Sequence, residues 1–229
     1  MFKPEDLFNL QQTEHARIFD ECKFAWEALK RIKEYIKSNR KPGNAATLQG
    51  QPFVGPDVSI GEGTVVEPGA MIKGPAIIGK NCQIRHGAYI REDVIIGDNC
   101  VVGNSCELKN AFLFNNVQVP HFSYVGDSIL GYKAHLGAGA TISNIKLMPE
   151  NIWIDVEGTP TDTGLRKFGA LVGDETDIGC NAVVNPGSII GKGSIIYPGV
   201  FWRGILPSHM IVKNRSQQDV VVRRPRTTT

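Results

Sequence analysis

The most regular feature of the chain is an aliphatic residue at every sixth position from Val54 to Leu108. Four positions after most of these aliphatics comes a small or β-branched residue, and just before it stands a residue that tolerates a tight corner. A unit with one inward aliphatic, one corner and one inward small residue is typical of a parallel β-helix. Three such units make one triangular coil, so residues 18 apart stack at about one strand spacing, ~4.8 Å.

The repeat sets the expected domain organisation. Residues 53–205 are expected to form a β-helix of about seven coils, followed by a C-terminal tail at 206–229. Within the β-helix the six-residue period fails from 147 to 168, which predicts a loop extruded from the coils. Long loops that leave a regular scaffold commonly serve a binding surface.

The N-terminal residues 1–40 do not follow the repeat. Apolar residues recur there at spacings of three and four, which predicts a short helix from Pro4 and a longer one from Thr13. Because a solenoid exposes its core at its ends, we expect this helical arm to cap the coils or pack against them; an oligomerisation arm is the alternative. Residues 41–52 are expected to be a linker.

Composition narrows the class of protein. The chain carries 25 Lys and Arg against 23 Asp and Glu, a formal net charge of +2, which indicates neither a nucleic-acid nor an acidic partner. No apolar run approaches the ~18 residues of a membrane span. The charged N-terminal segment also lacks the apolar region of a secretory signal peptide, so we expect a cytoplasmic protein without membrane contact. The five cysteines include no C-x-x-C pair; no disulfide or metal site is expected, and Cys82, Cys100 and Cys106 are interpreted as buried thiols.

Counting along the repeat places three cations one above another. Lys73, Arg91 and Lys109 each follow their aliphatic directly and are 18 positions apart. Like charges about 5 Å apart repel unless an anion screens them. One interpretation is a solvated basic stripe interleaved with Glu62 and Glu92. The other is a phosphate site, in which Arg supplies a planar fork and Lys a point charge.

Two further columns surround His121. One lies at a corner and points away from the core: Pro68, His86, Asn104, His121 and Ala138. The other is Tyr89, Glu107, Tyr124 and Thr141. Glu107 therefore lies one coil below the strand that follows His121. A corner histidine is most often only a polar surface residue, but a carboxylate in that place would orient the imidazole and raise its basicity.

Four stretches of the chain resemble known families. The segments V-G-N-S-C-E-L-K at 102–109, H-F-S-Y-V-G-D at 121–127 and L-G-A-G-A-T-I-S-N at 136–144 are similar to one acetyltransferase domain. That domain belongs to the bifunctional UDP-N-acetylglucosamine pyrophosphorylase/glucosamine-1-phosphate acetyltransferases. The segment T-G-L-R-K-F-G-A at 163–170 resembles the C-terminal domain of the archaeal-type sugar-1-phosphate nucleotidyltransferases.

The resemblance covers residues 53–205 and implies a left-handed β-helix that forms a homotrimer with sites between subunits. It implies that His121 is the general base and that Glu107 supports it. The remaining implied roles are sugar-phosphate binding at Arg91, Lys109, Tyr124 and Asn144, and acetyl-CoA binding at Ala138 and Cys180. Lys73 joins the phosphate-binding set through its place in the cation column. The sequence departs from the family at His135, Ile145 and Pro198, and Pro198 lacks a backbone donor.

The leading hypothesis is an acetyl-CoA-dependent N-acetyltransferase that acts on glucosamine-1-phosphate or galactosamine-1-phosphate, in nucleotide-sugar or cell-envelope precursor synthesis. His121 would take the proton of the 2-amine, and a backbone N–H near Ala138 would hold the oxyanion. The alternative is a non-catalytic hexapeptide-repeat subunit or a sugar-phosphate sensor. A γ-type carbonic anhydrase shares the fold, but His86 and His121 match its zinc ligands poorly. The sequence shows no nucleotidyltransferase domain, so no such activity is expected from it.

Overall fold

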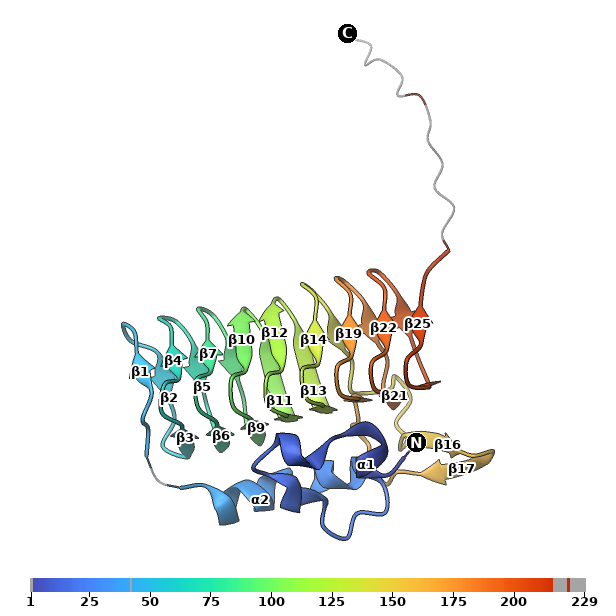
Figure 1. The fold of residues 1–229 in the computed structure, drawn as a ribbon, viewed down its shortest axis with the longest axis horizontal. Coiled ribbons are helices and arrows are strands. Elements are labelled where there is room, and N and C mark those ends of the chain that lie inside the picture. Colours follow the sequence, from blue (N-terminus) through green and yellow to red (C-terminus); the bar gives the residue numbers. More distant parts are fainter. Residues whose placement is uncertain (1, 42, 216–221, 223–229) are drawn as a thin grey trace.

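The chain forms a β-solenoid with helices along one side (Figure 1). The computed structural model describes residues 2–41, 43–215 and 222. Its strands wind into a left-handed parallel β-helix, which confirms the fold class predicted from the six-residue repeat. In the described part of the chain, no helix is long and apolar enough to cross a membrane.

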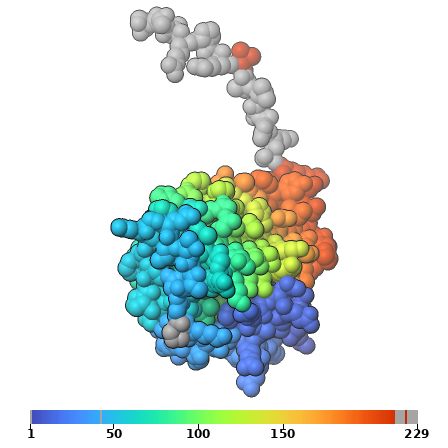
Figure 2. All heavy atoms as spheres, turned by 60° about the vertical axis from the view of Figure 1, so that its left-hand side comes forward, coloured from blue at the N-terminus to red at the C-terminus, as the bar shows by residue number. Residues whose placement is uncertain are grey.

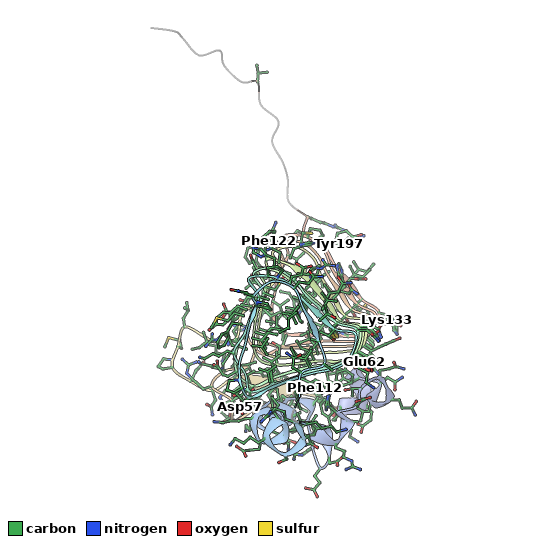
Figure 3. The ribbon with its side chains drawn as sticks, turned by 90° about the vertical axis from the view of Figure 1, so that its left-hand side faces the viewer. Asp57, Glu62, Phe112, Phe122, Lys133 and Tyr197 are labelled. Atoms are coloured by element: carbon green, nitrogen blue, oxygen red, sulfur yellow. The ribbon has the colours of Figure 1, made fainter. Side chains whose placement is uncertain are left out.

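Each turn contributes one short strand to each of three faces, which gives the triangular cross-section of Figure 3. Face 1 consists of β1 (Thr47–Leu48), β4 (Val65–Val66), β7 (Gln83–Ile84), β10 (Val101–Asn104), β12 (Gln118–His121), β14 (His135–Leu136), β19 (Asp177–Ile178), β22 (Ile195–Ile196) and β25 (Ile211–Val212). Face 2 consists of β2 (Phe53–Val54), β5 (Met71–Ile72), β8 (Tyr89–Ile90), β15 (Thr141–Ile142), β20 (Val183–Val184) and β23 (Phe201–Trp202).

Face 3 completes the triangle. It consists of β3 (Val58–Ile60), β6 (Ala76–Ile78), β9 (Val94–Ile96), β18 (Ala170–Val172), β21 (Ser188–Ile190) and β24 (Ile205–Leu206). Two longer strands run around the corner between faces 2 and 3 and belong to both: β11 (Glu107–Leu113) and β13 (Tyr124–Leu130). All of these neighbours pair in parallel, so each strand lies directly above the equivalent strand of the previous turn.

The solenoid is longer than the sequence indicates. It has about nine turns, whereas seven were expected. The coils extend past the expected range 53–205 at both ends, because β1 already pairs with β4 and β25 pairs with β22. The six-residue period is hard to see at these ends, since their strands are short and partly exposed. The rest of the expected tail, 216–221 and 223–229, lies outside the described residues.

Inward aliphatics from the three faces fill the interior of the coils. The members of the sixfold ladder are buried from Ile60 to Leu108, and only Val54 near the N-terminal end is partly exposed. The interpretation of Cys82, Cys100 and Cys106 as buried thiols is confirmed. Asparagines serve at several corners because this side chain tolerates a left-handed backbone, as at Asn81 with a φ of 54°.

Face 3 differs from the other faces because most of its outward residues are apolar. The outward residues of its strands stack in one column: Ser59, Ile77, Ile95, Phe112, Ile129, Leu171, Ile189 and Ile205. From Ile95 to Ile189 this column is fully buried. Removing such a side chain from water contributes about 1.5–3 kcal/mol. The column therefore provides the surface on which the N-terminal helices pack.

The helical arm lies along face 3 and packs against it (Figures 1 and 2). Its elements are α1 (Pro4–Leu7), η1 (Leu10–Gln12), η2 (Ala16–Phe19), η3 (Ala25–Lys30) and α2 (Ile32–Asn39). The contacts that hold it include α2 on β9 and β11, and η3 on β11 and β13. A hydrogen bond from the Asn9 N–H to Asp174 Oδ2, 2.6 Å long, ties the arm to the later coils.

The single longer helix predicted from Thr13 is wrong. The chain turns at Glu21, whose φ is 62°, and this left-handed residue separates η2 from η3. A new helical start follows, where the Glu27 carboxylate accepts the N–H groups of Lys23 at 2.7 Å and Phe24 at 3.2 Å. A three-to-four spacing of apolar residues shows which side faces the solenoid, but it does not show where the backbone breaks.

The segment 147–168 leaves the coils at the corner between faces 2 and 3. It contains an antiparallel hairpin of β16 (Trp153–Val156) and β17 (Thr159–Asp162). Ile154 is buried, whereas the Trp153 side chain is exposed. The hairpin lies at the same corner as the stacked cations, and therefore borders the candidate site.

Candidate active site

The corner between faces 1 and 2, here called the histidine corner, carries the predicted column of Pro68, His86, Asn104, His121 and Ala138. Asn104 pairs directly with His121 across β10 and β12. The Gly139 N–H donates to the His121 carbonyl at 3.0 Å, which places Ala138 in the next turn. The stacking predicted from the repeat is therefore present.

His121 and His86 share this corner but differ in their surroundings. The Nδ1 atom of His86 lies 2.6 Å from the Pro68 carbonyl oxygen, so its ring is already held by the backbone. The His121 side chain is exposed, and no residue of the described chain forms a hydrogen bond or ion pair with its ring. Both nitrogens of His121 are thus available to a substrate, which is what a general base requires.

Two backbone donors lie above His121 at the same corner. Asn181 donates its N–H to the Ala138 carbonyl at 2.9 Å, and Gly199 donates to the Cys180 carbonyl at 2.9 Å, so these corners stack. Within the described chain, the N–H groups of Ala138 and Cys180 have no acceptor. Free amide donors beside an imidazole are suited to hold a carbonyl oxygen that becomes negative.

The corner between faces 2 and 3, here called the cation corner, carries Lys73, Arg91 and Lys109. The parallel register confirms their stacking, since the Lys73 N–H donates to the Ile90 carbonyl and the Arg91 N–H to that of Leu108. The three cations do not stand alone, because a carboxylate lies beside each of them.

Glu92 and Glu107 neutralise the lower two cations. Glu92 Oε1 lies 3.2 Å from the guanidinium of Arg91, and Glu92 Oε2 lies 3.8 Å from Lys73 Nζ. Glu107 Oε1 accepts a hydrogen bond from Arg91 Nη1 at 2.9 Å. Burial alone raises the pKa of Glu92, but its backbone N–H and the charges of Arg91 and Lys73 outweigh burial and lower that pKa. The anion that the stacked cations require is thus supplied in part by the protein itself.

Asp127 holds the upper part of the cation corner. The two oxygens of its buried carboxylate lie 3.2 and 3.3 Å from Lys109 Nζ. The carboxylate also accepts a hydrogen bond from Asn110 Nδ2 at 2.9 Å and another from Asn144 Nδ2. Sequence reasoning did not single out Asp127. The signal that could have found Asp127 in the sequence is its place at a corner directly above Asn110. Asn and Asp both tolerate a left-handed backbone, and both residues adopt a positive φ of 45–48°.

Tyr124 and Asn144 meet above Gly126. A Cβ atom at Gly126 would lie 2.5 Å from the Tyr124 hydroxyl oxygen and 2.7 Å from Asn144 Nδ2, so only glycine leaves room for both. Burial, followed by the charges of Asp127 and Glu107, raises the pKa of the Tyr124 phenol. The phenol therefore remains a neutral hydrogen-bond donor at neutral pH.

Face 2 connects the two corners. Its outward column of Tyr89, Glu107, Tyr124 and Thr141 has the predicted register. Glu107 points toward Arg91 rather than toward the imidazole of His121. The structure does not bring Glu107 and His121 into contact, so the supporting role of Glu107 stays a prediction.

The predicted site residues thus fall into two groups joined by face 2. Lys109, Tyr124 and Asn144 gather around Asp127, with Arg91 and Lys73 below them. His121, Ala138 and Cys180 gather at the histidine corner. A cavity of about 540 Å³ lies elsewhere, under the helical arm. Among the described residues, no group of three or more His, Cys, Asp or Glu side chains could hold a metal ion.

Comparison with known proteins gives partial matches to bifunctional enzymes. Residues 72–159 match a family described as the GMPPB C-terminal domain. The chain is 37% identical over 94 residues to the bifunctional protein GlmU of Methanococcus vannielii. It is 36% identical over 97 residues to a bifunctional sugar-1-phosphate nucleotidylyltransferase/acetyltransferase of Sulfurisphaera tokodaii. These matches cover 41% and 42% of this chain but only 22% and 24% of those proteins.

A longer match extends over most of both chains. The uncharacterized acetyltransferase YaiX of Escherichia coli is 32% identical over 180 residues, which covers 77% of this chain and 78% of that protein. Among solved structures, the UDP-N-acetylglucosamine acyltransferase of Arabidopsis aligns with 73% of this chain and 67% of its own, at 16% identity and a TM-score of 0.43.

Proposed function

The chain belongs to the hexapeptide-repeat acyltransferases, and we propose that it transfers the acetyl group of acetyl-CoA to the 2-amine of an amino-sugar 1-phosphate. The observation that carries this proposal is the pairing of two corners across face 2. One corner has a free imidazole beside unpaired backbone donors, and the other has stacked cations arranged around Asp127. A sugar phosphate lying across face 2 would contact both corners.

His121 supplies the proton chemistry of the proposed reaction. As the 2-amine forms the new N–C bond with the thioester carbonyl, the imidazole takes one amine proton. The N–H of Ala138 donates to the carbonyl oxygen as it becomes negative. When the C–S bond breaks, the imidazolium returns its proton to the leaving thiolate. The products are the N-acetylated sugar phosphate and free coenzyme A.

The cation corner binds the 1-phosphate in this proposal. Arg91 offers a planar pair of N–H donors, and Lys73 and Lys109 add point charges. A phosphate dianion competes with the resident carboxylates Glu92 and Glu107 for these cations. The paired carboxylates hold the side chains in place before the phosphate arrives, which lowers the entropic cost of binding.

Homotrimer formation is a further part of the proposal. The outward column of face 2 is polar around Glu107 and Thr141 but exposes large apolar side chains toward its ends, at Phe53, Met71 and Phe201. Exposed apolar groups of this kind are typical of surfaces that another subunit covers. A second copy packed there would enclose the strip between the two corners and exclude water from the reaction.

A thiol-release assay tests the proposed function. The purified protein is mixed with acetyl-CoA and either glucosamine-1-phosphate or galactosamine-1-phosphate, and free coenzyme A is measured together with the mass of the sugar product. We expect release that requires both the amine and the phosphate. No release above that of a His121→Ala variant would contradict the enzymatic function, and phosphate binding without turnover would favour a sensor.

A further inference from the structure

Phe122 differs from all equivalent residues of the histidine corner. From Pro68 to Pro198, the residue that follows each member of the His121 column has a positive φ, and Phe122 has this place with a φ of 52°. In the other turns the place belongs to small or polar residues: Gly69, Gly87, Ser105, Gly139, Asn181 and Gly199. A bulky side chain in the left-handed region costs conformational energy, and residues of this kind cluster at functional sites.

The packing of the coils does not account for a phenylalanine at this position. Phe122 is 60% exposed, whereas the next residue, Ser123, is buried. Within the described chain, the one aromatic ring in contact with that of Phe122 belongs to His121. The two ring centroids are 6.2 Å apart, and the ring planes are inclined by 35°. The Phe122 ring is therefore a solvent-exposed apolar surface beside the proposed base.

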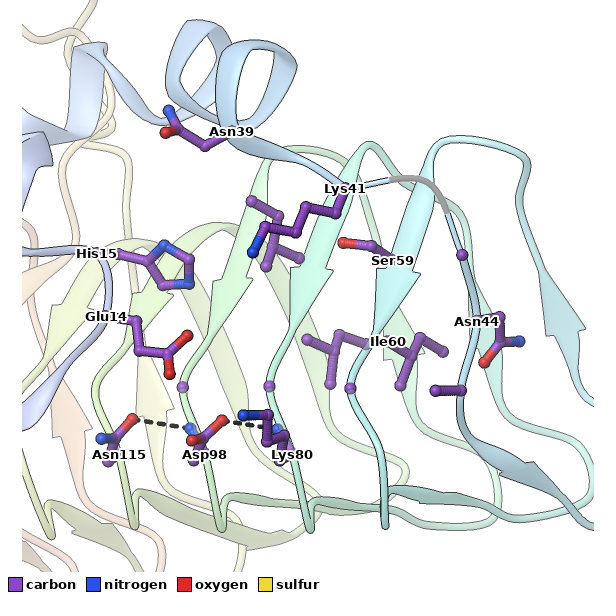
Figure 4. Close-up of a pocket in the computed structure, with 17 residues that line it drawn as sticks. Glu14, His15, Asn39, Lys41, Asn44, Ser59, Ile60, Lys80, Asp98 and Asn115 are labelled. Carbon is purple, nitrogen blue, oxygen red and sulfur yellow. Dashed lines mark hydrogen bonds between the residues drawn. The ribbon is translucent and has the colours of Figure 1, made fainter.

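The position of Phe122 relates it to the proposed path of the substrate. Figure 3 shows the residue at the vertex where faces 1 and 2 meet. Along the chain it lies between His121 and Tyr124, the first outward residue of face 2 in this turn. The cavity under the helical arm is at the corner between faces 3 and 1, and neither His121 nor Phe122 lines it (Figure 4). A substrate bound across face 2 to His121 therefore lies beside Phe122.

The chemistry of the proposed acceptor fits an aromatic neighbour. Its 2-amine must come within about 3 Å of a His121 nitrogen for the proton to be transferred. With the two side-chain rings 6.2 Å apart, a pyranose that carries this amine is within contact distance of Phe122. The C–H groups on one side of a pyranose form an apolar patch, which packs on the face of an aromatic ring and leaves the hydroxyls free.

We propose that Phe122 contacts the substrate and that its ring carries the apolar face of the amino sugar. This inference rests on the proposed function, because it requires the amine to reach His121. It adds a determinant of specificity to that function. The amine and the phosphate are recognised by hydrogen bonds and charge, whereas Phe122 recognises the pyranose that joins them.

Phe122→Gly removes the ring without damaging the corner, since glycine has the same place in four other turns and relieves the strained φ. We expect an unchanged Tm and a KM for glucosamine-1-phosphate about five- to tenfold higher. The kcat and the KM for acetyl-CoA should not change. Phe122→Tyr should keep the original KM, and so should the control Ser105→Gly, one turn below. A fall in kcat with an unchanged KM would overturn the proposal, because the ring would then act through His121.

The matched ligand is 2-aminoethyl phosphate. Its amine and its phosphate are joined through the same atoms as in glucosamine-1-phosphate, but it has no pyranose. As a competitor it should have equal inhibition constants with the unmodified protein and with Phe122→Gly. An equal loss of affinity for both ligands would show that the substitution disturbs the polar contacts, and would contradict a contact with the sugar ring.

Saturation-transfer NMR with glucosamine-1-phosphate separates this contact from catalysis. Irradiation of the aromatic resonances should saturate the sugar C–H protons in the unmodified protein, and much less in Phe122→Gly. Binding that depends on Phe122 without thiol release would support the contact and refute only the acyl transfer. The same saturation in both proteins, or none, would refute the contact. A smaller mass of Phe122→Gly in light scattering would assign the ring to a subunit interface instead.

Discussion

The buried carboxylate of Asp127 provides the sharpest test of the cation corner. Asp127→Asn keeps the size of the side chain but removes its charge and turns one acceptor oxygen into a donor. Lys109, Asn110 and Asn144 all donate to this carboxylate. The substitution therefore leaves the Lys109 ammonium without its counter-charge and brings a second donor toward it.

The magnitude follows from burial. Breaking one side of a buried ion pair costs about 3–5 kcal/mol. Here the Asp127 side chain is 5% exposed, but that of Lys109 is 16% exposed and retains some contact with water, which favours the lower end, about 3 kcal/mol. For a domain of this size, that loss corresponds to a fall in Tm of about 6–12 °C.

Differential scanning calorimetry of four proteins measures this effect. They are the unmodified chain, Asp127→Asn, Lys109→Met and the double variant. Because removing the stranded cation relieves the penalty, the double variant should melt above Asp127→Asn, with a coupling of about 1–3 kcal/mol. A Tm within about 2 °C of the unmodified protein for Asp127→Asn, or no recovery in the double variant, would refute the assigned role.

Three further results are expected. Arg91→Met should raise the KM for the sugar phosphate about 10- to 100-fold and leave the KM for acetyl-CoA unchanged in steady-state assays, because a charge-assisted hydrogen bond is lost; equal effects on both would contradict phosphate binding. Burial raises the pKa of Asp93, whose Oδ1 atom is buried without a partner. Its ionised form therefore destabilises the fold, and Asp93→Asn should raise the Tm at pH 7, with a gain that shrinks as pH falls through the raised pKa. Cys180 is the exposed cysteine, so one thiol should react rapidly with a maleimide, and acetyl-CoA should slow that reaction; equal rates with and without acetyl-CoA would count against binding at this corner.

The columns of the site could be read from the sequence because a solenoid is nearly one-dimensional. Once the six-residue period is known, the neighbour of each residue in the next turn follows from counting, and this placed Asn104 below His121 correctly. The short units after Leu108 did not disturb the stacking of Glu107 with Tyr124. The inward positions recur at fixed places in each six-residue unit, so the buried thiols were predictable as well.

Other features depend on contacts that counting does not reveal. The repeat places Glu107 on face 2 but does not show which neighbour its carboxylate binds, and its hydrogen bond from Arg91 follows from side-chain geometry. Asp127 shares one column with Asn110 and Asn144, but it also binds Lys109 from the neighbouring column, and counting along the repeat does not show that these side chains converge on it. The path of the helical arm depends on the turn at Glu21 and on the apolar column of face 3. That column was visible in the sequence as three consecutive apolar residues in strands such as Val94–Ile96.

The most direct test of the central claim compares two histidines of the same corner. His86 and His121 lie in one column, but only His121 has a free ring. In acetyl-CoA thiol-release assays with glucosamine-1-phosphate and galactosamine-1-phosphate, His121→Ala should lower kcat about 10²- to 10⁴-fold, as expected for loss of a general base. His86→Ala should retain nearly full activity. Equal activities of the two variants would contradict the assignment of His121 as the base.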